Sequence, residues 1–137
     1  LPQVRKTAGD RAVLRAMHVY ADDKRAVEQA KALRKGRMED FLGLVRDSGI
    51  SSALYLQNII PLGQTSDQSL MLTLALAESI LQGRGAVRVH GGGFGGTAQA
   101  YVPLEMFPAF KEKMEAVLGA GSCHKVSICP LGGAMIR

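Results

Sequence analysis

Hydrophobic residues recur at helical spacing over the first third of the chain. Between about residues 8 and 35, apolar side chains return every three or four positions with charged residues between them, which predicts one long amphipathic helix. Gly36 is a typical helix stop. A second helix is predicted from Met38, because apolar residues follow at i+3, i+4 and i+7, and the stretch 47–49 breaks its pattern. The amino-terminal part is therefore expected to be a helical pair that reverses at Gly36.

The middle of the chain has a different character. From residue 48 to residue 83 there are only two charged side chains. The proline, glycine and small polar residues of 61–67 predict a loop, and Ser66 or Asp67 is a suitable cap for a following helix over about 68–82. That helix is apolar nearly all round, so it is expected to be buried on most sides, either as a central helix or against another part of the protein.

After this helix the hydrophobic period becomes that of strands. The predicted helices and the strands named below together indicate an α+β domain in which a small antiparallel sheet carries helices packed on one face. A chain of 137 residues is long enough for one such domain and too short for two. The predicted elements are strands over 86–90, 97–102 and 125–128, a helix over 107–118, and a short last segment after the glycines at 132 and 133.

Composition narrows the functional classes. Hydrophobic residues make up 47% of the chain and charged residues 21%, which is ordinary for a globular domain. The net charge of +5 comes mainly from residues 1–47, where eleven basic residues are interleaved with seven acidic ones and lack aromatic partners. This pattern favours solvated helix faces over a nucleic-acid site. No apolar run reaches the roughly 18 residues of a membrane span, and no signal peptide is evident, so a cytoplasmic protein is expected.

Isolated polar residues offer little chemistry on their own. Cys123 and Cys129 have neither a disulfide framework nor metal-binding spacing, and are interpreted as small residues packed near a strand. No histidine pair has the spacing of a metal site on one helix face, and no metal site is expected. His90 is interpreted as packed at a strand end rather than touching a ligand, and Arg88 as solvated at a strand edge rather than facing a phosphate. Asp22 and its acidic neighbour are interpreted as solvated charges or caps and not as an acid/base pair.

The run of glycines over residues 91–96 is where chemistry is expected. Five glycines in six residues lie between two predicted strands, and each glycine is disfavoured by roughly 0.5–1 kcal/mol against alanine in a regular element. A tight hairpin needs only one or two of them. Close approach of the backbone to a ligand, with successive N–H groups forming an anion-binding nest, explains the run better. The dinucleotide fingerprint that the run satisfies by letter must open a helix, whereas this run opens a strand, so that match is accidental.

Residues 88–97, Arg-Val-His-Gly-Gly-Gly-Phe-Gly-Gly-Thr, resemble the third signature of the GHMP kinases, which phosphorylate galactose, homoserine, mevalonate and phosphomevalonate. Looser matches at 15–18, 51–58 and 127–133 make the chain most similar to the galactokinases within that superfamily. The resemblance covers nearly the whole chain. It implies that residues 1–137 are a single carboxyl-terminal domain of a longer kinase, an interpretation that also fits a chain beginning Leu-Pro-Gln rather than Met.

The same resemblance implies a ferredoxin-like fold packed against an amino-terminal domain of the same polypeptide, with the active site between them. ATP and Mg²⁺ are the implied cofactors of the full-length enzyme, and the aspartate base, the metal ligands and most sugar contacts belong to the other domain. No catalytic residue is therefore expected in these 137 residues, and the isolated domain is expected to be inactive. The implied phosphate-proximal loop consists of Gly91, Gly92, Gly93, Phe94, Gly95, Gly96 and Thr97.

Four functions stay open on the sequence. The first is an ATP-dependent kinase that converts galactose to galactose 1-phosphate. The second keeps the fold and takes another small alcohol of the homoserine or mevalonate type. The third is a non-catalytic relative that senses a ligand and binds a regulatory partner, and the fourth is a free-standing binding module.

Overall fold

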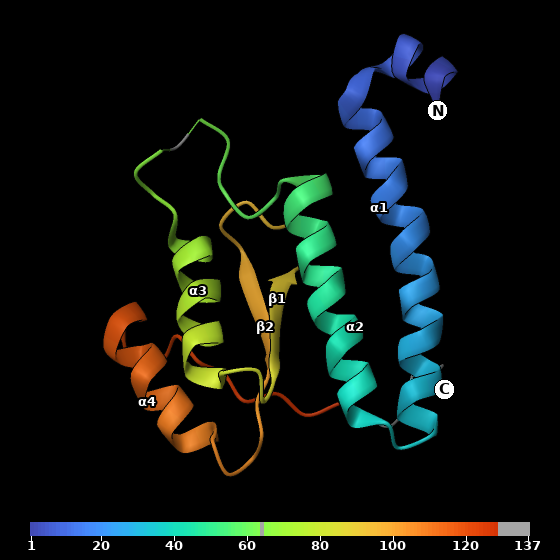
Figure 1. Ribbon diagram of the computed structural model, residues 1–137. Helices are drawn as coiled ribbons and strands as arrows, with labels where there is room; N and C mark the ends of the chain where they lie inside the picture. Colours follow the sequence, from blue (N-terminus) through green and yellow to red (C-terminus); the bar gives the residue numbers. More distant parts are fainter. Residues whose placement is uncertain (64, 129–137) are drawn as a thin grey trace, which may run out of the picture.

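The computed structural model describes residues 1–63 and 65–128 (Figure 1). Helices and an antiparallel sheet occur together, so the predicted α+β class is confirmed. In chain order the elements are α1 (Pro2–Arg34), α2 (Met38–Ser51), a π-helical extension η1 (Ser52–Leu56), α3 (Ser69–Leu81), β1 (Ala86–His90), β2 (Thr97–Tyr101) and α4 (Phe107–Leu118).

The sheet lies between two pairs of helices. Figure 1 shows α2 on one side of β1 and β2 and α3 on the other, with α1 outside α2 and α4 beside α3. The paired residues Ala86 and Tyr101 pack towards α2, while Val87 and Ala98 pack against α3 and α4. Helices therefore cover both faces, which corrects the expectation of helices on one face. The reason is that both faces of the sheet carry buried side chains, Ala86 on the side of α2 and Val87 on the side of α3 and α4, so each face needs a cover.

The first core cluster joins α1, α2 and the sheet. Ala32 near the end of α1 is buried with Phe41, Leu42 and Val45 of α2 and with the first residue of β1. The Phe41 ring meets the Tyr101 ring edge-on, with centroids 5.1 Å apart. The reversal between the helices at Gly36 is confirmed, and α1 is interrupted near its start, where Gly9 leaves the helical conformation.

The second helix runs further than its sequence pattern predicts. It continues through residues 47–49 to Ser51 and then through η1, so the predicted break is wrong. Gly49 does not end the helix but brings it close to the sheet, since a Cβ there would lie 3.0 Å from the Cβ of Arg88. A close helix–strand contact, rather than a turn, explains this glycine.

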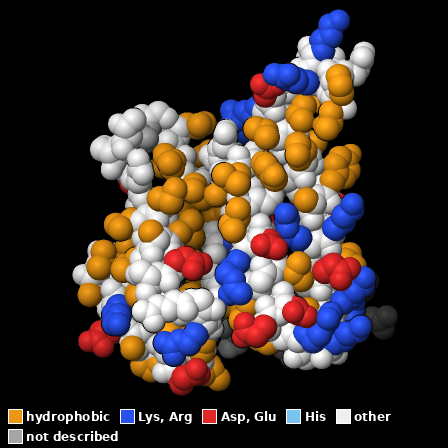
Figure 2. Space-filling model, viewed as in Figure 1, with side chains coloured by type: hydrophobic (Ala, Val, Ile, Leu, Met, Phe, Trp, Pro, Cys, Tyr) orange, Lys and Arg blue, Asp and Glu red, His pale blue; other side chains and the backbone are white. Residues whose placement is uncertain are grey.

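The second core cluster joins α3, α4 and the opposite face of the sheet. Leu81 is completely buried at the end of α3 and packs with Phe110 and Met114 of α4. The predicted helix 107–118 is confirmed, as is the helix predicted over 68–82, which forms over Ser69–Leu81. Only one side of α3 is buried, however, and hydrophobic side chains remain on the surface over α2, α3 and the seam between them (Figure 2).

The predicted third strand does not form. Residues 122–128 have no regular secondary structure, and Val126 and Ile128 are 82% and 90% exposed. Their alternation is a strand pattern, but a strand needs a partner for its backbone groups, and within the described residues only β1 and β2 pair. The expectations for Cys129 and the glycines at 132 and 133 lie outside the described residues.

Candidate functional site

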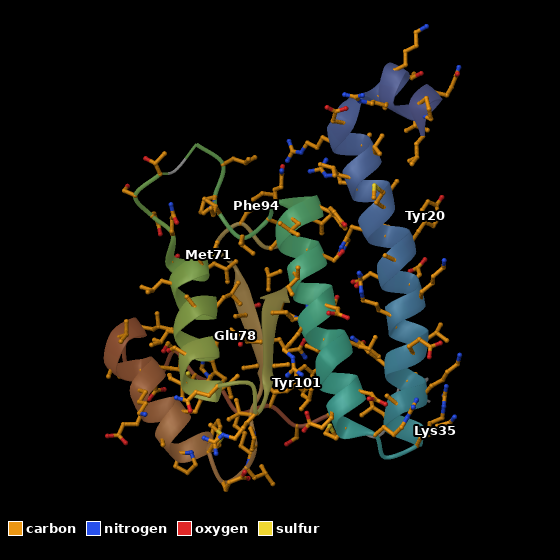
Figure 3. The ribbon with its side chains drawn as sticks, viewed as in Figure 1. Tyr20, Lys35, Met71, Glu78, Phe94 and Tyr101 are labelled. Carbon is orange, nitrogen blue, oxygen red and sulfur yellow. The ribbon has the colours of Figure 1, made fainter. Side chains whose placement is uncertain are left out.

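The glycine loop joins the two strands at one end of the sheet. His90 and Thr97 form the last pair of the ladder, and residues 91–96 connect them. Figure 3 shows Phe94 of this loop beside the carboxyl end of α2, far from Tyr101 at the other end of β2. The loop is exposed, apart from a half-buried Gly93, so it lies on the surface and not inside the fold.

Four residues of the loop have a positive φ. The φ angles of Gly91, Gly93 and Gly95 are 67°, 80° and 100°, and that of Phe94 is 56°. This region is strained for residues with a side chain, which explains three of the five glycines by local conformation. Phe94 is the exception, and such a non-glycine residue is retained where its surroundings hold it in place.

The surroundings that hold the loop are supplied by Asn58, just beyond η1. The N–H of Phe94 donates to the Asn58 carbonyl oxygen at 2.6 Å, and the Asn58 side-chain amide donates to the Gly92 carbonyl oxygen at 3.3 Å. Ser52 Oγ donates to Asn58 Oδ1 at 3.2 Å, and Asn58 is only 2% exposed. The chain reaches this position through Gln57, which is left-handed with φ 54°.

Gly93 lies directly against Asn58. A Cβ at Gly93 would collide with the Asn58 carbonyl oxygen and lie 2.9 Å from its Cβ and Cγ. At Gly92, in contrast, a Cβ would meet nothing within 4 Å, and φ is not positive. Neither local strain nor packing against the described residues therefore requires a glycine at position 92.

Several loop amides have no hydrogen-bond acceptor among the described residues. Among the hydrogen bonds of residues 1–63 and 65–128, the loop uses the N–H groups of Phe94 and Gly96, the latter donating to the Gly93 carbonyl oxygen at 3.3 Å. The N–H groups of Gly92, Gly93 and Gly95 donate to none of these residues. Successive backbone amides of a turn can bind an anion where they point to the same side.

A groove of about 690 Å³ begins beside the loop and runs between α3, α4 and the sheet. His90, Gly96 and Thr97 line its end nearest the loop, and Cys123 lines it together with the segment that follows α4. His90 is exposed there and not packed at a strand end as expected. The volume lies within the range of small-molecule sites, roughly 300–1,000 Å³.

Arg88 does not serve this loop. Its guanidinium donates to the hydroxyl of Ser48 and lies 3.9 Å from the Asp22 carboxylate, and its Nε donates to the Val89 carbonyl oxygen. The expected solvation at a strand edge is wrong, because β1 is covered by α2 on this side and the guanidinium needs partners there.

Asp22 is the centre of a polar network that the sequence reading missed. Ser48 Oγ donates to Asp22 Oδ1 at 2.6 Å, and an Arg25 nitrogen lies 3.0 Å from the same oxygen. His18 lies one helical turn before Asp22, buried, with Nδ1 3.0 Å from Ser51 Oγ. Burial raises the pKa of Asp22, but the hydrogen bond from Ser48 and the nearby positive charges outweigh it, so the net pKa is lowered. Asp22 is thus a structural carboxylate and not a solvated charge.

The spacing of this network is a signal that could have been recognised. His18 and Asp22 are four residues apart on α1, and Ser48 and Ser51 are three apart on α2, so each pair shares one helix face. Polar pairs on the faces that two helices turn towards each other predict an interhelical network. The same reasoning does not identify Asn58, which lies beyond a helix in an irregular segment.

The remaining titratable groups are of interest as metal ligands and as a reactive thiol. Within the described residues, no group of three or more histidine, cysteine, aspartate or glutamate side chains is placed to hold a metal ion. Cys123 is half-buried. Burial and, to a smaller extent, the nearby charge of Glu115 raise the pKa of its thiol.

No helix in the described part of the chain combines the length and apolarity needed to cross a membrane. No protein-family model matches the sequence.

Proposed function

We propose that this chain is the carboxyl-terminal domain of an ATP-dependent small-molecule kinase of the GHMP type. The observation that supports the proposal best is the loop 91–96, which is exposed, rich in glycine, and has amides at Gly92, Gly93 and Gly95 that no described residue uses. Its sequence resembles the third GHMP signature, and its place between two strands fits an anion-binding turn and not a Rossmann helix start.

The role of the loop is to bind the phosphates of the nucleotide. A hydrogen bond from an amide to a charged oxygen contributes about 1.5–3 kcal/mol, so two or three of them position a phosphate firmly. Phosphoryl transfer also needs charge neutralisation and an acceptor that is aligned with the phosphate. Those functions fall to Mg²⁺ and to an amino-terminal domain of the same polypeptide, so residues 1–137 alone are expected neither to catalyse the transfer nor to hold ATP or Mg²⁺ tightly.

The surface around the loop supports a domain partner. Exposed large apolar residues lie on several segments that follow one another, Ile50 on α2, Leu54 on η1, Leu62 in the following loop and Leu72 on α3. Their segment carries few charges. Figure 2 shows exposed hydrophobic side chains over α2 and α3 and between them. Exposed apolar surface is typical of an interface, here with the amino-terminal domain.

The proposed acceptor is a sugar hydroxyl, with galactose as the substrate and galactose 1-phosphate as the product. The motifs that favour galactose over homoserine or mevalonate-type alcohols are the looser matches at 15–18 and 51–58. The first of these contains His18 and the second contains Ser51 and Ser52, all of which are buried structural residues. They therefore support membership of the galactokinase branch through its architecture and not through contacts with a sugar. ATP and free sugars are cytoplasmic metabolites, so we place the enzyme in the cytoplasm.

The experiment is a coupled ADP-release assay on the full-length protein with Mg-ATP and a panel of galactose, homoserine and mevalonate. We expect galactose-dependent ADP release, a higher KM for Mg-ATP in Gly92→Ala, and no change in Gly43→Ala, a glycine in α2 with equally open surroundings. The Gly92→Ala methyl group would meet no described residue within 4 Å, so a raised KM would report contact with the ligand and not a packing defect. Turnover with homoserine or mevalonate would place the enzyme in a different branch of the GHMP kinases. Nucleotide binding without any turnover would favour a non-catalytic relative that senses a ligand. Sugar-dependent ADP release by residues 1–137 alone would refute the division of roles.

A further inference from the structure

We infer that Asn58 is a positioning residue for the phosphate-binding loop, and that it acts by aiming the amide of Gly93 at the ligand. The inference rests on the proposed function for the identity of the ligand, a nucleotide phosphate. Its structural basis is independent of that function, because it follows from the hydrogen bonds that Asn58 makes on both sides.

The direction of the Gly93 amide follows from the geometry of a peptide bond. In a trans peptide, the C=O and the N–H of the same unit point in opposite directions, and the chain has no cis peptide bonds in its described part. The carbonyl oxygen of Gly92 points at the Asn58 side chain, which donates to it at 3.3 Å. The N–H of Gly93 belongs to the same peptide unit, so it points away from Asn58, and among the described residues it has no acceptor.

The next peptide unit is fixed in the reverse sense. The N–H of Phe94 donates inward to the Asn58 carbonyl oxygen at 2.6 Å, so the carbonyl of Gly93 points away from Asn58. There it accepts the N–H of Gly96 at 3.3 Å, which folds the second half of the loop back. One residue thus sets two successive peptide planes, and these planes decide which polar groups the loop offers to solvent.

Ser52 determines how the Asn58 side chain is oriented. Its hydroxyl donates to Asn58 Oδ1 at 3.2 Å, which leaves the amide nitrogen of Asn58 for Gly92. Both side chains are buried, so water does not replace these bonds. If the Asn58 amide turned over, its oxygen would face the Gly92 carbonyl, and the peptide plane would lose its anchor.

The test uses Asn58→Asp and Asn58→Ala in the full-length protein. The aspartate keeps the size of the side chain but places a second acceptor against the Gly92 carbonyl, and alanine removes both side-chain bonds. We expect either change to raise the KM for Mg-ATP by about tenfold or more, as for the loss of a hydrogen bond to a charged group, while the KM for the acceptor stays unchanged. Ser52→Ala should have a smaller effect in the same direction.

Val45→Ala is the matched control, because Val45 is buried on α2 in the cluster around Ala86 and not at the loop. It should lower the melting temperature and leave the KM for Mg-ATP within about twofold of the wild-type value. The inference is overturned if Asn58→Asp also stays within that range, or if Val45→Ala raises the KM as much as the Asn58 variants do.

A second readout separates this inference from the proposed function. In full-length protein labelled with ¹⁵N-glycine, ADP should shift the Gly93 amide resonance in the wild type and shift it much less in Asn58→Asp. This result would support the positioning role even if no acceptor were phosphorylated, in which case only the kinase proposal would fail. If ADP left the Gly93 resonance of the wild type unshifted, the positioning role itself would be contradicted.

Discussion

Gly93→Ala is the most direct test of how the loop is seated. The new Cβ would meet the backbone carbonyl oxygen of Asn58, which cannot rotate away, and would do so at a φ of 80°. The left-handed conformation disfavours alanine by about 1–2 kcal/mol, and overpacking a well-filled site adds about 1–3 kcal/mol. The variant should therefore lose roughly 2–5 kcal/mol of unfolding free energy if the loop stays docked.

Two neighbouring glycines divide this loss into its parts. Gly91 has a positive φ of 67° but open surroundings, so Gly91→Ala should show the conformational strain alone, about 1–2 kcal/mol. Gly92 has neither strain nor a contact, so Gly92→Ala should be neutral or slightly stabilising. Urea unfolding of the three variants at equal m-values gives the comparison. A Gly93→Ala variant no less stable than Gly91→Ala would show that the loop does not rest on Asn58.

Three further predictions concern stability and reactivity away from the loop. Gly43→Ala should raise the unfolding free energy by about 1 kcal/mol, because this helical glycine has open surroundings; a loss in urea unfolding would contradict that. Asp22 has a lowered pKa when folded, so its carboxylate stabilises the fold above the unfolded pKa of about 3.9, and this contribution is lost as the pH falls through the folded pKa. The Asp22→Asn variant should have a lower melting temperature than the wild type at pH 7. Its melting temperature should also depend less on pH in the acidic range, and a pH profile like that of the wild type would exclude the Asp22 network as the cause of the lower melting temperature. In a variant without the second cysteine, Cys123 should react with a disulfide reagent at pH 8 more slowly than a free thiol does. The further substitution Glu115→Gln should speed this reaction, because it lowers the pKa of the thiol.

The parts of the fold that the sequence predicts well are those determined by local pattern. The helices over α1, α3 and α4 and the two strands follow from hydrophobic spacing, which depends only on the faces that are buried. The failures have a tertiary cause. Gly49 carries a helix-breaking signal but sits where α2 touches β1, and the Val126 and Ile128 alternation lacks a strand to pair with among the described residues.

The candidate site divides in the same way. The glycines of residues 91–96 predict the loop, because an excess of glycine over the needs of a hairpin is visible in a single sequence. Its anchor is not predicted, since Asn58 lies 34 residues before Gly92 and meets it only through the packing of the segment after η1 against the loop. The sequence does not predict the contacts of Arg88 for a similar reason, because its partners Ser48 and Asp22 come from two different helices.

The commitment of Arg88 to that network affects how the loop can act. A guanidinium bound to Ser48 and Asp22 is not free to meet a phosphate, so at this position the loop offers oriented amides and not a positive side chain. Amide dipoles bind an anion well only when they are fixed before the ligand arrives, because reorienting them would consume the energy they supply. A loop of glycines has no such rigidity by itself. The rigidity has to come from outside the loop, and the buried Asn58 is the residue whose hydrogen bonds supply it.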